Sequence, residues 1–306
     1  MADISQIGIL TPVLWEDGHN SGKSLLKFFQ KADELGFGSI WVPDRLISNG
    51  PAFPSPLVLL SMAAAVTKRV MLGTSVLIAS IRHPLEIAQH AASLDSLSDG
   101  RFILGLGMGG RVNEFTSMGI SQSDRLGRFL ESVSLYKSLL NEQGKVIPGK
   151  HFAVEPFTLH PKPKSSIPIL FGARADKALI RTGQLSDGWI QGGAGTDKEF
   201  LINWQKVMQA CYETGRDPSD LLNGKLIYVN TGKDIRRAIA EVETQLHRYY
   251  GDALGKEQVF AIGSAEEIAN KIRLYKNAGL QIPMLGLPQP DVEKLSFIAE
   301  EVVPLI

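Results

Sequence analysis

Three glycine-rich segments are the residues of this sequence best suited to binding a ligand. They are GLGMGG at 105–110, FGAR at 171–174 and QGGAG at 191–195, and each continues a short apolar run. Because glycine has no Cβ, its backbone N–H can come close to an anionic group. Any one segment is better explained by a tight turn between a strand and a helix, but the three together favour a ligand site.

A phosphate group is the ligand part that these segments suit. Gly172, Ala173 and Arg174 precede a predicted helix, whose free N–H groups and dipole favour negative charge, and Arg174 adds a bidentate donor. GLGMGG is no dinucleotide-binding fingerprint, because the acidic residue expected ~20 positions later, after a second strand, is missing.

The side chains that could do chemistry are few. Asp44 and Arg45 follow the apolar run SIWV and are the candidate catalytic pair. A structural ion pair and a polar wall facing the substrate explain them equally well. His83 precedes Pro84 at a predicted helix start, where histidine more often caps or packs than acts as a base.

Metal and nucleophile motifs are absent from the sequence. The histidines His19, His151, His160 and His247 are scattered, no HExxH-like spacing occurs, and no serine lies in a GxSxG motif. Cys211, the only cysteine, lies in a predicted amphipathic helix without an activating partner, so we expect a buried structural thiol. The chemistry would therefore have to come from an organic cofactor.

Strands and helices alternate along the chain, which predicts an α/β fold, the (β/α)8 TIM barrel. The predicted strands are 7–10, 39–42, 70–77, 102–106, 167–171, 187–191, 225–229 and 284–287. The predicted helices are 24–35, 56–66, 84–97, 125–140, 175–185, 200–214, 234–249, 265–278 and 291–302. A doubly wound open sheet is the second candidate. Segment 144–163 interrupts the alternation and is rich in proline, which suggests a hairpin or an irregular cover.

Composition excludes several classes of protein. Thirty-two basic and thirty-two acidic residues give a net charge of zero, so we expect no binding to nucleic acid or to an anionic membrane. No apolar run approaches the ~20 residues of a membrane span, and the N-terminus lacks a leader pattern. We expect a cytoplasmic enzyme with a small-molecule substrate.

Segment 72–110, LGTSVLIASIRHPLEIAQHAASLDSLSDGRFILGLGMGG, resembles the bacterial luciferase-like monooxygenase family of flavin- and F420-dependent oxidoreductases. Three further segments agree with that family: ADELGFGSIWVPDR, GARADKALIRTGQLSDGWIQGG and IGSAEEIANKIRLYKNAGL. The resemblance implies one TIM-barrel domain over 1–306, with FMN or the deazaflavin F420 bound at the C-terminal end of the barrel. It also implies insertions at about 144–163 and 247–264 that cover the substrate.

The resemblance assigns residues to the cofactor. A cis peptide that lies behind the middle ring of the flavin in many members falls at Ser75-Val76. The residues expected at the cofactor are Ser75, Val76, Gly107, Met108, Gly109, Gly110, Gly172, Ala173, Arg174, Gly192 and Gly193, the last five near its phosphate.

Two positions depart from the branch of the family that oxidises sugar phosphates with F420. That branch has a histidine where this chain has Arg45 and a glutamate acid where it has Gly110. Both losses argue against that particular reaction.

The sequence leaves three functions open. The first is an FMN-dependent monooxygenase that uses reduced flavin and O2 on a small organic substrate, with a separate flavin reductase as partner. The second is an F420-dependent dehydrogenase or reductase, and the third is a non-catalytic flavin-binding protein. Because family members commonly dimerise, we expect a homodimer.

Overall fold

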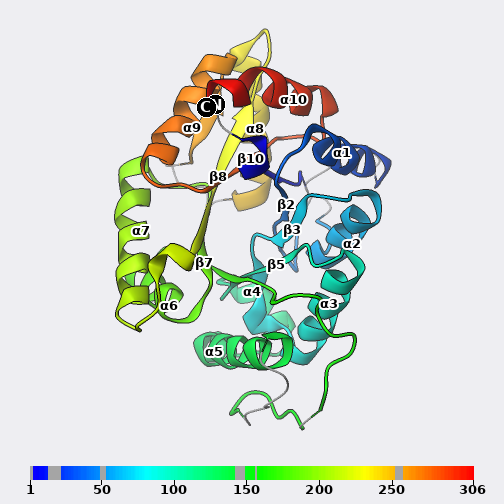
Figure 1. Cartoon of the computed structure of the whole chain (residues 1–306), viewed down its shortest axis with the longest axis vertical. Helices are drawn as coiled ribbons and strands as arrows, with labels where there is room; N and C mark the ends of the chain where they lie inside the picture. Colours follow the sequence, from blue (N-terminus) through cyan, green and yellow to red (C-terminus); the bar gives the residue numbers. More distant parts are fainter. Residues whose placement is uncertain (1–2, 13–21, 49–52, 142–148, 156, 252–257) are drawn as a thin grey trace.

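The computed structural model of the chain describes residues 3–12, 22–48, 53–141, 149–155, 157–251 and 258–306. Within these residues, eight parallel strands form a closed barrel with helices around it (Figure 1). In their order around the barrel they are β1 (Gly8–Leu10), β2 (Ser39–Val42), β3 (Met71–Thr74), β5 (Phe102–Gly107), β6 (Ile169–Gly172), β7 (Gly188–Gln191), β8 (Leu222–Asn230) and β10 (Ile282–Gly286). The last strand, β10, pairs with both β1 and β8, so the sheet closes. The predicted TIM barrel is confirmed, and the open sheet is wrong.

The predicted helices are present with small shifts at their ends. They are α1 (Gly22–Leu35), α2 (Pro56–Val66), α3 (Pro84–Leu97), α5 (Arg125–Tyr136), α6 (Asp176–Leu185), α7 (Asp197–Tyr212), α8 (Ile235–Tyr250), α9 (Ala265–Asn277) and α10 (Val292–Phe297). Helices α5 and α10 end earlier than predicted because each continues as a turn of π-helix, Lys137–Asn141 and Ile298–Val302.

Three short elements were not predicted: β4 (Leu77–Ile78), α4 (Val112–Ser117) and β9 (Phe260–Ile262). The predicted strand 70–77 is divided at Ser75-Val76, where the peptide bond is cis, and the chain then pairs with β5 as β4. The described parts of segment 144–163, which are 149–155 and 157–163, contain neither strand nor helix, so the chain is irregular there and the hairpin is not formed in them. Residues 144–148 and 156 lie outside the described residues, as does His19.

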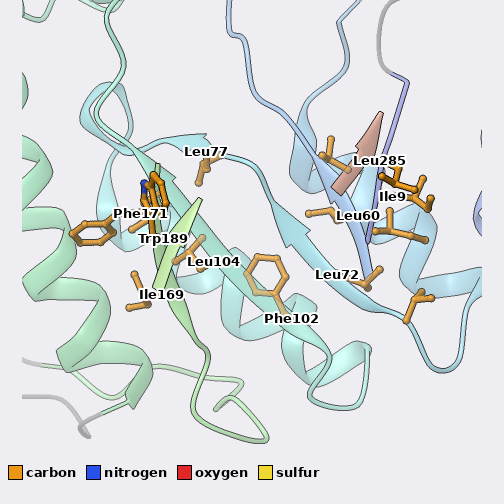
Figure 2. Packing of buried hydrophobic residues seen from close by; sticks show 14 of the residues in the cluster. Ile9, Leu60, Leu72, Leu77, Phe102, Leu104, Ile169, Phe171, Trp189 and Leu285 are labelled. Atoms are coloured by element: carbon orange, nitrogen blue, oxygen red, sulfur yellow. The ribbon is translucent and has the colours of Figure 1, made fainter. Parts of the chain in front are cut away.

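Side chains alternate between two apolar layers along each strand. Phe102, Leu104, Ile169 and Phe171 belong to the layer between the barrel and the helices, as Figure 2 shows. Ile9 of β1 and Leu285 of β10 belong to the same layer, on neighbouring strands. The residues between them in sequence fill the barrel interior, namely Leu10, Trp41, Ile103, Leu170, Ile190, Leu226 and Met284. Both layers are buried, which is why the strands are almost continuously apolar.

Trp41 is the largest side chain of the barrel interior. It is fully buried, and its Nε1 donates to Ser39 Oγ at 2.7 Å. A Cβ added to Gly73 would lie 2.3 Å from the Trp41 ring, and one added to Gly8 would lie 2.8 Å from its Nε1. The indole therefore requires glycine on both neighbouring strands.

Candidate active site

A cavity of about 660 Å³ lies at the C-terminal end of the barrel. This volume is within the ~300–1,000 Å³ range of small-molecule sites. All predicted site residues except Arg45 and Gly110 line it: Asp44, Ser75, Val76, Gly107, Met108, Gly109, Gly172, Ala173, Arg174, Gly192 and Gly193. The strand exits thus converge on one site, as the barrel predicts.

Val76 forms one wall of the cavity. It follows the cis peptide Ser75-Val76 and lies against the ends of β5 and β6. A Cβ added to Gly107 would lie 2.5 Å from Val76 Cγ2, and one added to Gly172 would lie 3.0 Å from Val76 Cγ1. These two glycines make room for Val76.

Gly192 differs from these glycines, because no heavy atom would lie within 4 Å of an added Cβ. Gly193, beside it, could not carry a side chain, since its Cβ would lie 2.4 Å from Tyr228 Cε2. Gly192 is therefore the position where a ligand can approach the backbone of the QGGAG turn directly.

Lys225 supports this turn from behind. Its Nζ donates to the carbonyl oxygens of Gly192 at 3.1 Å and Ala194 at 2.9 Å, and Tyr275 Oη donates to that of Gly195 at 2.8 Å. Lys225 is fully buried, and burial lowers its pKa to about 7. Sequence analysis missed this residue, although a lysine within an apolar strand is unusual enough to be a signal.

Cations and unpartnered polar atoms make the cavity suitable for a polar heterocycle with an anionic tail. Arg174 and Arg181 line it near the start of α6, where no side chain caps the helix. Thr11 Oγ1, Gln191 Oε1 and Gln258 Oε1 are buried without a hydrogen-bond partner, and all three residues line the cavity. Since such atoms destabilise the protein unless they are paired, they indicate where a bound ligand makes hydrogen bonds.

Asp44 lines the cavity, but both of its carboxylate oxygens are engaged. Oδ2 accepts from the backbone N–H of Ile78 at 2.9 Å, and Oδ1 accepts from Arg82 Nη2 at 3.0 Å. Burial raises the pKa of Asp44, and the adjacent Arg82 opposes that shift. The ion pair is made with Arg82, not with Arg45, and it anchors the chain just after Val76.

Arg45 and Gly110 do not line the cavity. The Arg45 guanidinium lies 4.9 Å from the Tyr249 ring centre and 5.8 Å from that of Phe53, and its Nε and Nη2 are buried without a hydrogen-bond partner. Gly110 is exposed, and a Cβ there would meet no atom within 4 Å.

Tyrosines from β8 and α8 form the wall that sequence analysis missed. Tyr228, Tyr249 and Tyr250 line the cavity, and the hydroxyls of Tyr228 and Tyr250 lie 3.0 Å apart. Burial raises the pKa of both hydroxyls. In the sequence, only Tyr228 is marked as a possible site residue, because it lies at the end of a predicted strand. Tyr249 and Tyr250 lie at the end of α8, and only the course of that helix in the fold brings them to the cavity.

The other polar candidates have structural positions. His83 Nδ1 accepts from Leu85 N at 3.3 Å at the start of α3, which confirms the capping role. Cys211 is buried, as predicted. Within the described ranges, no group of three His, Cys, Asp or Glu side chains could hold a metal ion, and no helix has the length and apolarity needed to cross a membrane.

Comparison with known proteins shows the family. The family model for luciferase-like monooxygenases matches residues 6–281. An F420-dependent glucose-6-phosphate dehydrogenase of Nakamurella multipartita is 36% identical over 89% of this chain and 89% of its own length. An F420-dependent hydroxymycolic acid dehydrogenase of Mycobacterium tuberculosis is 27% identical over 92% of this chain and 83% of its own length.

A solved structure agrees with the fold. An F420-dependent secondary alcohol dehydrogenase, in complex with an F420-acetone adduct, superposes with a TM-score of 0.83 at 22% identity, covering 98% of both chains. The barrel, the cavity at its C-terminal end and the match over residues 6–281 lead to one conclusion: this chain belongs to the luciferase-like monooxygenase family and is an oxidoreductase.

Proposed function

We propose that this chain is an F420-dependent oxidoreductase that transfers hydride between F420 and a small organic substrate. The observation that carries the proposal is that relatives matched along most of both chains are F420-dependent dehydrogenases. This favours F420 over FMN, the cofactor that sequence analysis placed first, and a dehydrogenase or reductase over a monooxygenase.

The cavity residues are suited to the parts of this cofactor. Val76 offers an apolar contact for the ring system, and the unpartnered Thr11, Gln191 and Gln258 offer hydrogen bonds to polar groups. Arg174, Arg181 and the open backbone at Gly192 suit the phosphate tail. When bound, F420 supplies a carbon that accepts or donates a hydride, while the protein orients the substrate and excludes water.

Oxidation of a sugar phosphate is not part of the proposal. Arg45 and Gly110 replace the histidine and the acidic residue of that branch, and neither lines the cavity. Among the described residues, the cavity is lined by two arginines, Arg174 and Arg181. Both are assigned to the phosphate tail of the cofactor, so no further arginine of the cavity could bind the phosphate of a substrate.

Titration of the purified protein with F420 and with FMN, followed by fluorescence, tests the cofactor. We expect saturable binding of F420 at micromolar concentration and much weaker binding of FMN. Micromolar binding of FMN without binding of F420 would overturn the proposal and restore the monooxygenase hypothesis. Binding of F420 without hydride transfer to or from any of a panel of alcohols, ketones and enones would favour a non-catalytic binding protein.

We propose a homodimer, which light scattering after size-exclusion chromatography tests, and a cytoplasmic location, which cell fractionation tests. The separate flavin reductase belongs only to the FMN hypothesis, because F420-dependent hydride transfer needs no reaction of reduced flavin with O2.

A further inference from the structure

The hydroxyl groups of Tyr228 and Tyr250 lie together in the wall of the cavity. Tyr228 lies at the end of β8 and Tyr250 at the end of α8, and their Oη atoms are 3.0 Å apart. Each hydroxyl can donate one hydrogen bond and accept two. One hydrogen is used between the two tyrosines, so the pair keeps one hydrogen to donate to a ligand in the cavity.

The barrel places this pair across the cavity from Val76. In the cyclic order β1, β2, β3, β5, β6, β7, β8, β10, strand β8 stands four places from β3, which is the opposite side of an eight-stranded barrel. Val76 follows β3 and touches the ends of β5 and β6. If a planar ring were held against Val76, the tyrosine side of the cavity would be left for the substrate.

Apart from the tyrosines, no described side chain at the cavity wall is a free carboxylate or imidazole. Asp44, the one carboxylate among the described lining residues, is paired with Arg82 and with the Ile78 N–H, and no histidine lines the cavity there. The hydroxyls are neutral at physiological pH, and burial raises the pKa of both above the usual tyrosine value. A neutral tyrosine can donate a proton, which reduction of a carbonyl requires.

The surroundings of the pair indicate an uncharged substrate that gains negative charge during the reaction. Val242 and Leu246 of α8 are apolar parts of the same wall. Behind it, Arg45 lies over the Tyr249 ring, and Arg111 Nη2 donates to the Tyr249 carbonyl at 3.4 Å. Two guanidinium groups behind the tyrosines favour an oxygen on which negative charge develops.

We propose that Tyr228 and Tyr250 together donate the proton to the oxygen of an uncharged ketone or aldehyde, which this enzyme reduces. A hydride from the reduced deazaflavin forms the new C–H bond at the carbonyl carbon, and the C=O π bond breaks. The hydroxyl pair gives a proton to the resulting oxygen, which forms the O–H bond of the alcohol. The carbonyl gains two electrons and the deazaflavin loses two. A solvent proton restores the pair, and the oxidised deazaflavin releases its remaining proton to solvent.

A binding experiment tests the hydrogen bond without turnover. Cyclohexanone labelled with 13C at the carbonyl is added to the protein loaded with oxidised F420, with which a ketone cannot react. We expect a saturable bound-state carbonyl resonance that lies downfield of the one in Y228F/Y250F, because a donated hydrogen bond polarises the C=O bond. In Y228F/Y250F the shift falls to the value of the ketone in an apolar environment, while F420 still binds.

A kinetic experiment tests the proton transfer. With reduced F420 and cyclohexanone, kcat of Y228F/Y250F is expected to fall on the order of 10²-fold or more, with KM changed much less. Y212F is the matched control, because Tyr212 is 68% exposed on α7, and it retains the wild-type kcat.

The outcomes separate this inference from the proposed function on which it rests. Absence of F420 binding refutes the proposed function itself. Binding of F420 without a saturable ketone shift, an equal shift in Y228F/Y250F, or an unchanged kcat in that variant overturns the tyrosine assignment alone.

Discussion

At the scale of single residues, the glycines that line the cavity fall into two groups, according to whether an added Cβ would clash with a protein atom. Gly107 and Gly172 leave room for Val76 and Gly193 leaves room for Tyr228, so their roles are internal packing. Gly192 is exposed in the wall of the cavity and an added Cβ would meet no heavy atom within 4 Å, which makes it the glycine whose absent Cβ a ligand can use. Sequence could not separate these roles, because all of them lie in similar glycine-rich segments.

Gly192→Ala tests this distinction. The added methyl group meets no protein atom, so the free energy of unfolding stays within about 0.5 kcal/mol of wild type. F420 affinity falls about tenfold, equivalent to about 1.4 kcal/mol, because the methyl group occupies ligand space. Gly110→Ala is the matched control: its Cβ also meets no atom, but it lies outside the cavity, so affinity is unchanged. Equal affinities in the two variants, both at the wild-type value, would contradict the assignment of Gly192.

Lys225 predicts a pH dependence of stability. Its folded-state pKa of about 7 lies below the value of about 10.4 in the unfolded chain. Between these values the unfolded chain binds a proton that the folded chain lacks, so the free energy of unfolding rises with pH above about 7. The rise from this group is at most about 1.4 kcal/mol per pH unit.

Lys225→Met removes that rise, because it has no group to titrate. Urea unfolding of both proteins at pH 7 and pH 9 measures the difference. We also expect weaker F420 binding in the variant, since the carbonyls of Gly192 and Ala194 lose their donor and the turn is no longer held. Parallel pH profiles for the two proteins would show that Lys225 keeps an ordinary pKa.

At the scale of elements, single polar side chains fix how a helix meets the barrel. Asp33, in the last turn of α1, accepts backbone N–H bonds from Lys68 at 3.1 Å, Arg69 at 2.8 Å and Val70 at 2.9 Å. These three residues lie between α2 and β3, so one carboxylate joins two neighbouring units of the fold. Apolar spacing predicted α1 well, but it carries no information on which loop a polar residue of the helix will reach.

Asp33→Ala is expected to lower the free energy of unfolding by about 2–3 kcal/mol, because it leaves backbone N–H groups without an acceptor. Burial opposes ionisation of Asp33, but the backbone bonds outweigh it and lower its pKa. Its stabilising effect is therefore complete above about pH 4 and is lost as the pH falls through the lowered value. Glu34→Ala, at the exposed neighbouring position, is the control and changes stability little. Equal urea midpoints for the two variants would count against this role.

At the scale of the whole molecule, the barrel is closed because β10 pairs with both β1 and β8. Its interior is filled by the apolar side chains that point inward from the strands. Trp41 is the largest residue of that interior layer and is fully buried against glycines of β1 and β3. Its neighbours could not close the space left by a smaller side chain without distorting the strands.

Trp41→Ala is therefore expected to lower the free energy of unfolding by about 3–5 kcal/mol, measured by urea denaturation. Leu97→Ala provides a control, because Leu97 is 81% exposed and its truncation costs about 0.5 kcal/mol or less. A loss for Trp41→Ala as small as that of the control would mean that the barrel interior repacks.

Much of the candidate site followed from the sequence, because a parallel barrel gathers its strand exits at one end. The sequence predicted the exits after β3, β5, β6 and β7, and the structure brings them to one cavity. Asp44 was predicted there as well, but its partner Arg82 was not. Arg45, its neighbour in sequence, was predicted at the site and instead lies behind Tyr249.

The sequence by itself determined the order of strands and helices, the glycine-rich exits and the resemblance to a family of oxidoreductases, since these depend on local periodicity and on motifs. Only the tertiary structure decided which glycine is open to a ligand, where the ion pair of Asp44 lies and that Tyr228 meets Tyr250. These contacts join residues 22 to 38 positions apart, on elements whose path across the barrel end no local pattern encodes. The residues around the cavity could therefore be outlined from sequence, whereas the candidate proton donor appeared only in the fold.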